Sequence, residues 1–379
     1  MENRTVAEVF APGEFIAEEL EARGWSQIEL AEILGRPPKL VSQLIAGKCA
    51  ITPETAKGLG SAFGTGAEFW MNLERDYRLA RTVHDDTTVE RRARLYAKAP
   101  IKEMAMRHWI EPSENVDVLE KRVLDFLRIK SIEEEPSLAH AAKKTGAYAE
   151  VTTAQWAWLF RVIQMAEATS VRPYSQRSLL EALPKLDACM MAPEEARHVP
   201  RILAECGVRF VIVERLQQAT IDGACCWLGG SSPVIAMSLR KDKIDNFWFV
   251  LRHEIEHVLR GHGKDSAIID TDLEGAKAGS GESLPEEERM ANYAAANFCV
   301  PTEKITSFMR RKHPYYYERD VVAFAQTVGR HPGIVIGQLQ FRLDDYKYLG
   351  KRLALYRIRD HVVPGATVDG WGQAAQVNN

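Results

Sequence analysis

Short amphipathic runs, separated by glycine or proline, fill the first 80 residues. Residues 12–23 place Phe15, Ile16 and Leu20 on one face of a helix that stops before Gly24. The later runs are residues 27–34 after a capping Ser26, residues 39–46, a run opened by Thr52 and Pro53, and residues 67–79. The pattern predicts a helical domain over residues 1–80, with helix-turn-helix spacing in its second and third helices.

Two regions with different patterns follow. Residues 81–200 alternate charged and apolar positions at helical spacing, which predicts a helical linker or dimerisation region. Residues 201–365 mix strand-like and helix-like runs: strands at 207–214, 222–228 and 233–239, and helices at 246–260 and 283–300 around a loop at 262–282, with Ser283 as a helix cap. The polar residues 366–379 predict a flexible tail. The fold class expected is mostly α, with a smaller α+β part that contains a small sheet.

Composition narrows the class of protein. Of 379 residues, 46% are hydrophobic and 27% charged, as in ordinary globular proteins. No apolar run reaches the roughly 18 residues of a membrane span, and the first residues lack the apolar core of a signal peptide. Six scattered cysteines with no CxxC pattern favour reduced thiols over a disulfide framework. We therefore expect a cytoplasmic protein without a membrane partner.

Residues 253–257 read His-Glu-Ile-Glu-His, an HExxH motif. Helix positions four apart share a face, so the imidazoles of His253 and His257 can bind one ion, and Glu254 can reach a water bound to it. The apolar flanks of the motif predict a helix buried on one side. Burying these polar groups costs free energy unless a partner compensates them. The motif therefore predicts a Zn²⁺ site.

A zinc site of this kind needs a third protein ligand. Glu288 is the favoured carboxylate, with Glu286 and Glu287 as alternatives that would otherwise complement the helix dipole. Asn292, one turn after Glu288, can accept a hydrogen bond from a ligand histidine and fix its tautomer. His262 lies beyond the helix stop and is interpreted as a loop histidine.

These residues predict hydrolysis of a peptide bond. Zinc lowers the pKa of a bound water toward about 7 and polarises the carbonyl. Glu254 would take the water proton and pass it to the leaving amine. A further donor is needed for the oxyanion. The downstream candidates, none of which we assign, are Tyr315, Tyr316, Tyr317 and His331.

The helix-turn-helix spacing predicts contacts to double-stranded DNA. At the start of a recognition helix, Lys39 can read guanine and Gln43 adenine. The other candidate contacts are Gln27, Ser42 and Lys48. The charge does not favour DNA binding, because the net charge is −3 and residues 1–80 contain twelve acidic and eight basic residues. A small protein–protein module is therefore the alternative for this domain.

The N-terminal residues resemble a known family of regulators. The segments Gly13-Glu-Phe-Ile-Ala-Glu-Glu-Leu, Trp25-Ser-Gln-Ile-Glu-Leu-Ala-Glu-Ile-Leu-Gly and Val41-Ser-Gln-Leu-Ile-Ala-Gly-Lys are similar to HigA-type antitoxins of the XRE, lambda-repressor-like, family. The resemblance covers about a fifth of the chain. Two adjacent prolines, Pro37 and Pro38, depart from the family pattern.

The second half resembles the ImmA/IrrE metallopeptidases, on Asn246-Phe-Trp-Phe-Val-Leu-Arg-His-Glu-Ile-Glu-His-Val-Leu and Glu288-Arg-Met-Ala-Asn-Tyr-Ala-Ala-Ala-Asn-Phe-Cys-Val-Pro. The resemblance implies a thermolysin-like (gluzincin) domain with His253, His257 and Glu288 as zinc ligands and Glu254 as base. It also implies that residues 233–239 form the edge strand that pairs with a peptide. The family often has Gly where Glu256 stands, and a carboxylate there would attract a basic substrate or disturb the site.

The sequence as a whole predicts a homodimeric DNA-binding transcriptional regulator that carries a zinc endopeptidase. Its expected partners are an operator and a protein substrate, either a repressor or antitoxin or the chain itself. The alternative is a non-enzymatic antitoxin or repressor whose peptidase-like domain binds a cognate toxin or senses a ligand. A third interpretation is a protease whose N-terminal module binds protein.

Overall fold

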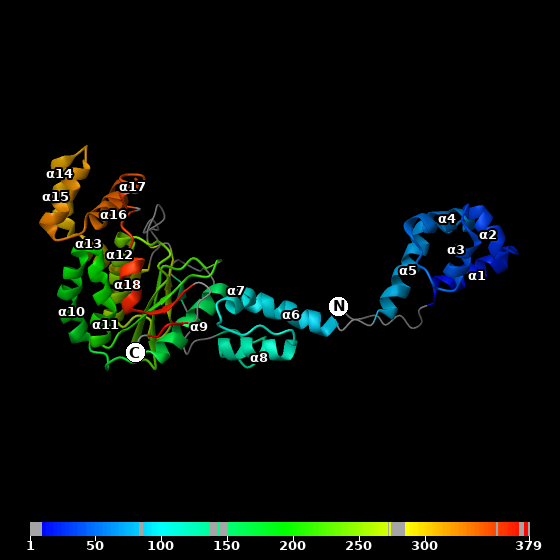
Figure 1. Cartoon of the computed structure of the whole chain (residues 1–379), viewed down its shortest axis with the longest axis horizontal. Helices are drawn as coiled ribbons and strands as arrows, with labels where there is room; N and C mark the ends of the chain where they lie inside the picture. Colours follow the sequence, from blue (N-terminus) through cyan, green and yellow to red (C-terminus); the bar gives the residue numbers. More distant parts are fainter. Residues whose placement is uncertain are drawn as a thin grey trace. The chain divides into compact units, whose positions relative to one another are not determined.

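The computed structural model describes residues 10–82, 86–136, 143–144, 151–217, 219–271, 273, 285–353, 355–370 and 375–377. The chain divides into two compact units, residues 1–89 and 90–379. Each unit has its own apolar core, and each is described by itself (Figure 1). The predicted cap Ser283 and part of the predicted loop 262–282 lie outside the described residues.

The first unit is a helical domain, as the sequence predicts. Its helices are α1 (Pro12–Arg23), α2 (Gln27–Leu34), α3 (Pro38–Ile45), α4 (Pro53–Phe63) and α5 (Ala67–Arg81). Ser26 caps α2, accepting a hydrogen bond from the backbone of Glu29, whose side chain accepts one in return. The third helix begins one residue earlier than predicted, because Pro38 lacks an N–H and suits the first helical position.

A close approach of two helices shapes this domain. A Cβ built on Gly13 in α1 would lie 2.2 Å from the carbonyl oxygen of Ile45 in α3, so only glycine fits there. The core beneath is apolar, with Ile16, Leu30 and Trp70 at 0% exposure. This packing fixes α3 against α1 and leaves the other side of α3 in solvent.

The second unit combines a sheet with many helices. Its strands are β1 (Lys143–Lys144), β2 (Arg209–Val213), β3 (Gly223–Leu228), β4 (Ser232–Met237), β5 (Ile268–Asp270) and β6 (Thr367–Asp369). Its helices are α6 (Asp86–Lys98), α7 (Ile101–Met106), α8 (Val116–Leu127), α9 (Thr153–Ala168), α10 (Gln176–Ala188), α11 (Val199–Glu205), α12 (Ile244–Arg260), α13 (Glu286–Cys299), α14 (Thr302–Lys312), α15 (Glu318–Val328), α16 (Pro332–Leu343), α17 (Gly350–Leu353) and α18 (Arg359–Val362). Short 3₁₀ turns cover Cys189–Met191, Pro193–His198 and Val363–Gly365.

The strand order is β1-β5-β3-β4-β2-β6. β3 runs antiparallel to β4 and β5, and the remaining pairs are parallel. The prediction that residues 233–239 form an edge strand is wrong, because β4 lies between β3 and β2 and its hydrogen bonds are used on both sides. The family resemblance placed this strand at an edge, but the strands that pair with it are set by segments elsewhere in the chain.

Both faces of the sheet are covered by helices. Phe210, Cys225 and Ile235 pack on one face against α12, and Val211, Ala224 and Val234 pack on the other with α9. This alternation follows from the two-residue repeat of a strand. This packing fixes α12 against the sheet. Side chains of α12 and of the strands can therefore meet at one site.

The role predicted for residues 81–200, a helical linker or dimerisation region, stays a prediction. The described residues from 90 onward belong to the second unit, and Trp158 of α9 is fully buried there. The indole nitrogen of Trp158 donates a hydrogen bond of 2.8 Å to the carbonyl of Val213 in β2. The apolar character of α9 is explained by the sheet face that it covers, which lies some fifty residues later in the chain.

The C-terminal residues are more ordered than the predicted tail. Thr367–Asp369 forms β6, which pairs with the outer edge of β2. Asp369 is buried and accepts a hydrogen bond from Arg161 of α9. The open backbone groups of β2 and the charge of Arg161 explain this order. No described helix is both long and apolar enough to cross a membrane.

Candidate metal centre

Helix α12 carries the HExxH motif with one face against the core. Phe247, Trp248 and Leu251 fill that core, and Gly261 ends the helix in a left-handed conformation, as predicted. Its polar residues His253, Glu254 and His257 are all at 0% exposure. The helix therefore places its ionisable groups inside the unit, where each needs a compensating partner.

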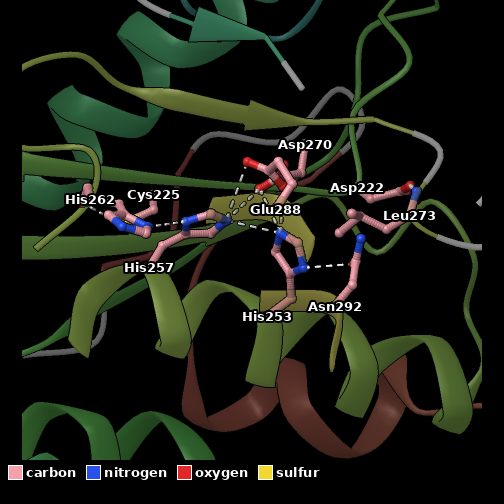
Figure 2. Close-up of polar contacts among 9 residues, drawn as sticks. All are labelled: Asp222, Cys225, His253, His257, His262, Asp270, Leu273, Glu288 and Asn292. Atoms are coloured by element: carbon pink, nitrogen blue, oxygen red, sulfur yellow. Dashed lines mark hydrogen bonds and ion pairs between the residues drawn. The ribbon is translucent and has the colours of Figure 1, made fainter. Parts of the chain in front are cut away.

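The two histidines face each other and a carboxylate from α13. The Nε2 atoms of His253 and His257 lie 3.0 Å apart. One oxygen of Glu288 is 3.3 Å from Nε2 of His253, and the other is 3.6 Å from Nε2 of His257. Asp270, at the end of β5, is the fourth member of the cluster. Figure 2 shows these side chains converging from α12, α13 and β5.

This donor set fits a zinc ion. Ligand atoms bound tetrahedrally at about 2.0–2.1 Å stand about 3.3–3.4 Å from one another, close to the separations observed among His253, His257 and Glu288. No described residue donates a hydrogen bond to Oε2 of Glu288, although this atom is buried. A cation between these groups would satisfy the buried oxygen and the two ring nitrogens together.

The electrostatics of the cluster also favour a cation. Burial lowers the pKa of His253, but the facing carboxylates of Asp270 and Glu288 together outweigh it and raise the pKa to about 9. Burial raises the pKa of Glu254 well above its usual value, and the neighbouring Asp270 raises it further. Both groups lie in the negative potential of Asp270, which attracts positive charge.

The Nδ1 atom of each of the two histidines contacts a different residue. Oδ1 of Asn292 lies 3.0 Å from Nδ1 of His253, and Nδ1 of His262 lies 3.0 Å from Nδ1 of His257 (Figure 2). These contacts leave the Nε2 atoms to face the centre of the cluster. The structure thus gives His262 a contact that the sequence interpretation missed. Gly261 was the feature of the sequence that could have indicated this contact. The turn at Gly261 returns the chain toward α12, and the backbone N–H of His262 donates a hydrogen bond to the carbonyl of His257.

Glu254 lies against the sheet. A Cβ built on Gly223 would stand 2.2 Å from Oε1 of Glu254, so the strand β3 leaves room for this carboxylate only by having glycine there. Gly223 pairs with Asp270 in the neighbouring strand β5. Asp270 was also missed by the sequence interpretation, which treated residues 262–282 as loop. The available signal was an apolar pair, Ile268 and Ile269, followed by an acid.

The structure separates the alternative ligands. Glu288 is 2% exposed, whereas Glu286 is exposed and Glu287 is half-buried. Glu256 accepts hydrogen bonds from Arg252 at 2.7 Å and Arg260 at 2.6 Å, which lower its pKa although burial raises it. Glu256 is thus paired with two arginines of its own helix, and the expectation that it attracts a basic substrate or disturbs the site stays a prediction.

Two of the four oxyanion candidates make contacts elsewhere, and the other two are exposed. His331 caps α16, with its Nδ1 accepting a hydrogen bond from the backbone of Gly333. Tyr315 and Tyr317 are exposed, and Tyr316 packs against Tyr348.

The candidate DNA contacts lie on one helix-turn-helix. Gln27 begins α2, Lys39 and Ser42 are exposed on α3, and Lys48 follows it. Gln43 is half-buried, with its neighbours Val41 and Leu44 in the core. Nearby, Arg36 forms an ion pair with Glu54. The polar side of α3 is therefore available to a partner.

Comparisons with known proteins match both units. Residues 16–70 match the family model described as helix-turn-helix, and residues 207–344 match that of the IrrE N-terminal-like domain, a peptidase family. The HTH-type transcriptional regulator YddM of Escherichia coli K12 is 36% identical over 69 residues, which are 18% of this chain and 73% of that protein. The chain belongs to the helix-turn-helix regulators and carries an IrrE-like domain.

Two other relatives match the same N-terminal part of the regulator. Virulence-associated protein I of Dichelobacter nodosus is 32% identical over 79 residues, 21% of the regulator and 73% of that protein. A HigA-family addiction module antidote protein from Coxiella burnetii is 38% identical, covering 19% of the regulator and 79% of that structure, with a TM-score of 0.19. The comparisons confirm a DNA-binding helix-turn-helix and a metallopeptidase-family domain.

Proposed function

We propose that the regulator is a zinc endopeptidase joined to an operator-binding domain. The observation that carries this proposal is the convergence of His253, His257 and Glu288 from two helices, at the separations that a tetrahedral ion requires. The family match of residues 207–344 supports the same chemistry.

The chain's own residues divide the work of hydrolysis. Zinc, when bound, supplies a Lewis acid that polarises the scissile carbonyl and acidifies a water. Glu254 would take the proton of the attacking water and later deliver it to the leaving amine. Burial and the neighbouring Asp270 raise its pKa, which favours the protonated form until a bound cation offsets them. Asn292 and His262 hold the two imidazole rings in place.

The proposed partners follow from the two units. The N-terminal unit of a homodimer would bind an operator through Gln27, Lys39, Ser42, Gln43 and Lys48. The peptidase would cleave a repressor-like or antitoxin-like protein, or the regulator itself. The alternative is a non-enzymatic regulator whose second unit binds a toxin or senses a ligand, and the complete burial of Glu254 favours it.

The test is metal content followed by cleavage. We expect one zinc per chain by mass spectrometry of the native protein, and a strong reduction in Glu288→Ala. Glu254→Gln should keep zinc and lose cleavage of the chain itself and of a denatured peptide library. Glu286→Ala, which changes an exposed carboxylate on the same helix, is the control for both measurements.

Two results would reject the proposal. If the purified protein contains no zinc even after zinc is supplied, the second unit folds without metal and the protein is a DNA-binding regulator without the proposed peptidase site. Cleavage at an equal and measurable rate by the native protein and Glu254→Gln would remove Glu254 as the base.

A further inference from the structure

Asp270 lies where an additional ligand to the proposed ion would stand. Its Oδ2 atom is 3.5 Å from Nε2 of His253 and 4.0 Å from Nε2 of His257, while the ligand oxygens of Glu288 are 3.3 and 3.6 Å from the same nitrogens. Ligand atoms of all four residues lie within 4.8 Å of one another. Figure 2 shows the Asp270 carboxylate beside that of Glu288.

The number of protein ligands separates two kinds of zinc site. A catalytic site has three protein ligands and keeps its fourth position for water or substrate, whereas a site with four protein ligands is closed. We propose that Asp270 fills the fourth position and holds the peptidase in a latent state, so that Asp270 must move before a water can be activated. This inference rests on the zinc site of the proposed function.

The surrounding backbone holds Asp270 in place. The carbonyl of Asp270 accepts a hydrogen bond of 2.8 Å from the N–H of Asp222, and Asp270 pairs with Gly223 of β3. The side chain of Asp222 accepts a hydrogen bond of 2.9 Å from the backbone of Leu273 and forms an ion pair with Arg240. Asp270 and Leu273, three residues later, are therefore both tied to Asp222, which is 3% exposed.

The same strand is also covered along its outer edge. β1 pairs with β5 in parallel, with Lys143 opposite Ile268 and Lys144 opposite Ile269. An extended peptide that binds by strand addition needs free backbone groups at a sheet edge. In this structure β5 has strands on both sides, so a peptide can reach it only after β1 leaves. Displacement of β1 would open this edge to a peptide, whereas release of Asp270 requires that β5 itself move.

Cobalt spectroscopy of the full-length protein tests the closed donor set without using activity. Co²⁺ would replace zinc, and acetohydroxamate would serve as a small chelating probe of an open position. We expect the visible cobalt spectrum of the native protein to stay unchanged with the probe, and that of the near-isosteric Asp270→Asn to shift. Zinc affinity in competition with a chelator should fall at least tenfold in Asp270→Asn, the scale on which ligand-supporting groups act.

Controls separate this inference from the zinc site itself. Asp265→Asn, at an exposed aspartate five residues earlier, should behave as the native protein. A probe response of equal size in the native protein and Asp270→Asn would overturn the closed site and leave the three-ligand site intact. Absence of cobalt and zinc from the native protein would instead reject the proposed function. If Asp270→Asn fails to fold, X-ray absorption of the native zinc protein decides, since a water in the first coordination shell would overturn the inference.

Discussion

The two units place their candidate functional groups in opposite environments. In the N-terminal unit Lys39, Ser42 and Lys48 are exposed, and the core beneath them is apolar. In the second unit His253, His257 and Asp270 are fully buried, and they lie beside a Glu288 that is 2% exposed. A recognition surface adds little cost to folding, whereas a buried ionisable cluster costs free energy until an ion compensates it. Metal should therefore matter for the stability of one unit only.

Removal of the metal is expected to have the largest effect. A ligand present at about a thousand times its dissociation constant stabilises the folded state by about 4 kcal/mol. At roughly 2–4 °C per kcal/mol, chelation should lower the melting temperature of the second unit by about 8–16 °C. Calorimetry with zinc and with a chelator measures this. Chelation that lowers the melting temperature of the N-terminal unit equally, or that of Glu288→Ala as much as that of the native protein, would contradict the prediction that metal stabilises the second unit only.

A glycine in the sheet gives a smaller test of the same buried site. Gly223→Ala places a Cβ against Oε1 of Glu254, and we expect it to cost about 1–3 kcal/mol and to displace that carboxylate. Denaturant unfolding measures the cost. Gly370→Ala is the matched control, because a Cβ there meets nothing within 4 Å. Equal stability of the two variants would show that Glu254 is not held against β3.

The DNA-binding surface should respond without any change in folding. Gln43→Ala is expected to weaken operator binding by about 1–3 kcal/mol, and Lys48→Ala to reduce the salt dependence of binding by about one ion. Fluorescence anisotropy over a salt series measures both. Lys102→Ala, an exposed lysine in the second unit, should change neither. A fall in melting temperature on Gln43→Ala would mean that this half-buried side chain supports the fold instead.

The sequence predicted well what is encoded locally. Ser26 as a cap and Gly261 as a helix end were identified from single residues with their immediate neighbours, because capping is decided within one turn. The two helices of the proposed zinc site were predicted in the same way, from residues 246–260 and 283–300.

The sequence failed where distant segments decide the structure. The interior position of β4, the role of α9 and the order of β6 each depend on a partner far along the chain. Asp270 was missed for the same reason, since its place beside His253 is set by the pairing of β5 with β3. The apolar pair Ile268 and Ile269 before Asp270 indicates a short strand, but it does not show which strand pairs with it.

The separate anchoring of the two imidazoles has a consequence for which ions the protein accepts. His253 is fixed from α13 and His257 from the turn after α12, so neither ring can rotate to suit a different coordination geometry. Divalent copper binds nitrogen and oxygen ligands more strongly than zinc does but prefers a tetragonal arrangement. Selectivity for zinc in this regulator would then come from the rigidity of two ring planes, and loosening either one would widen the range of metals bound.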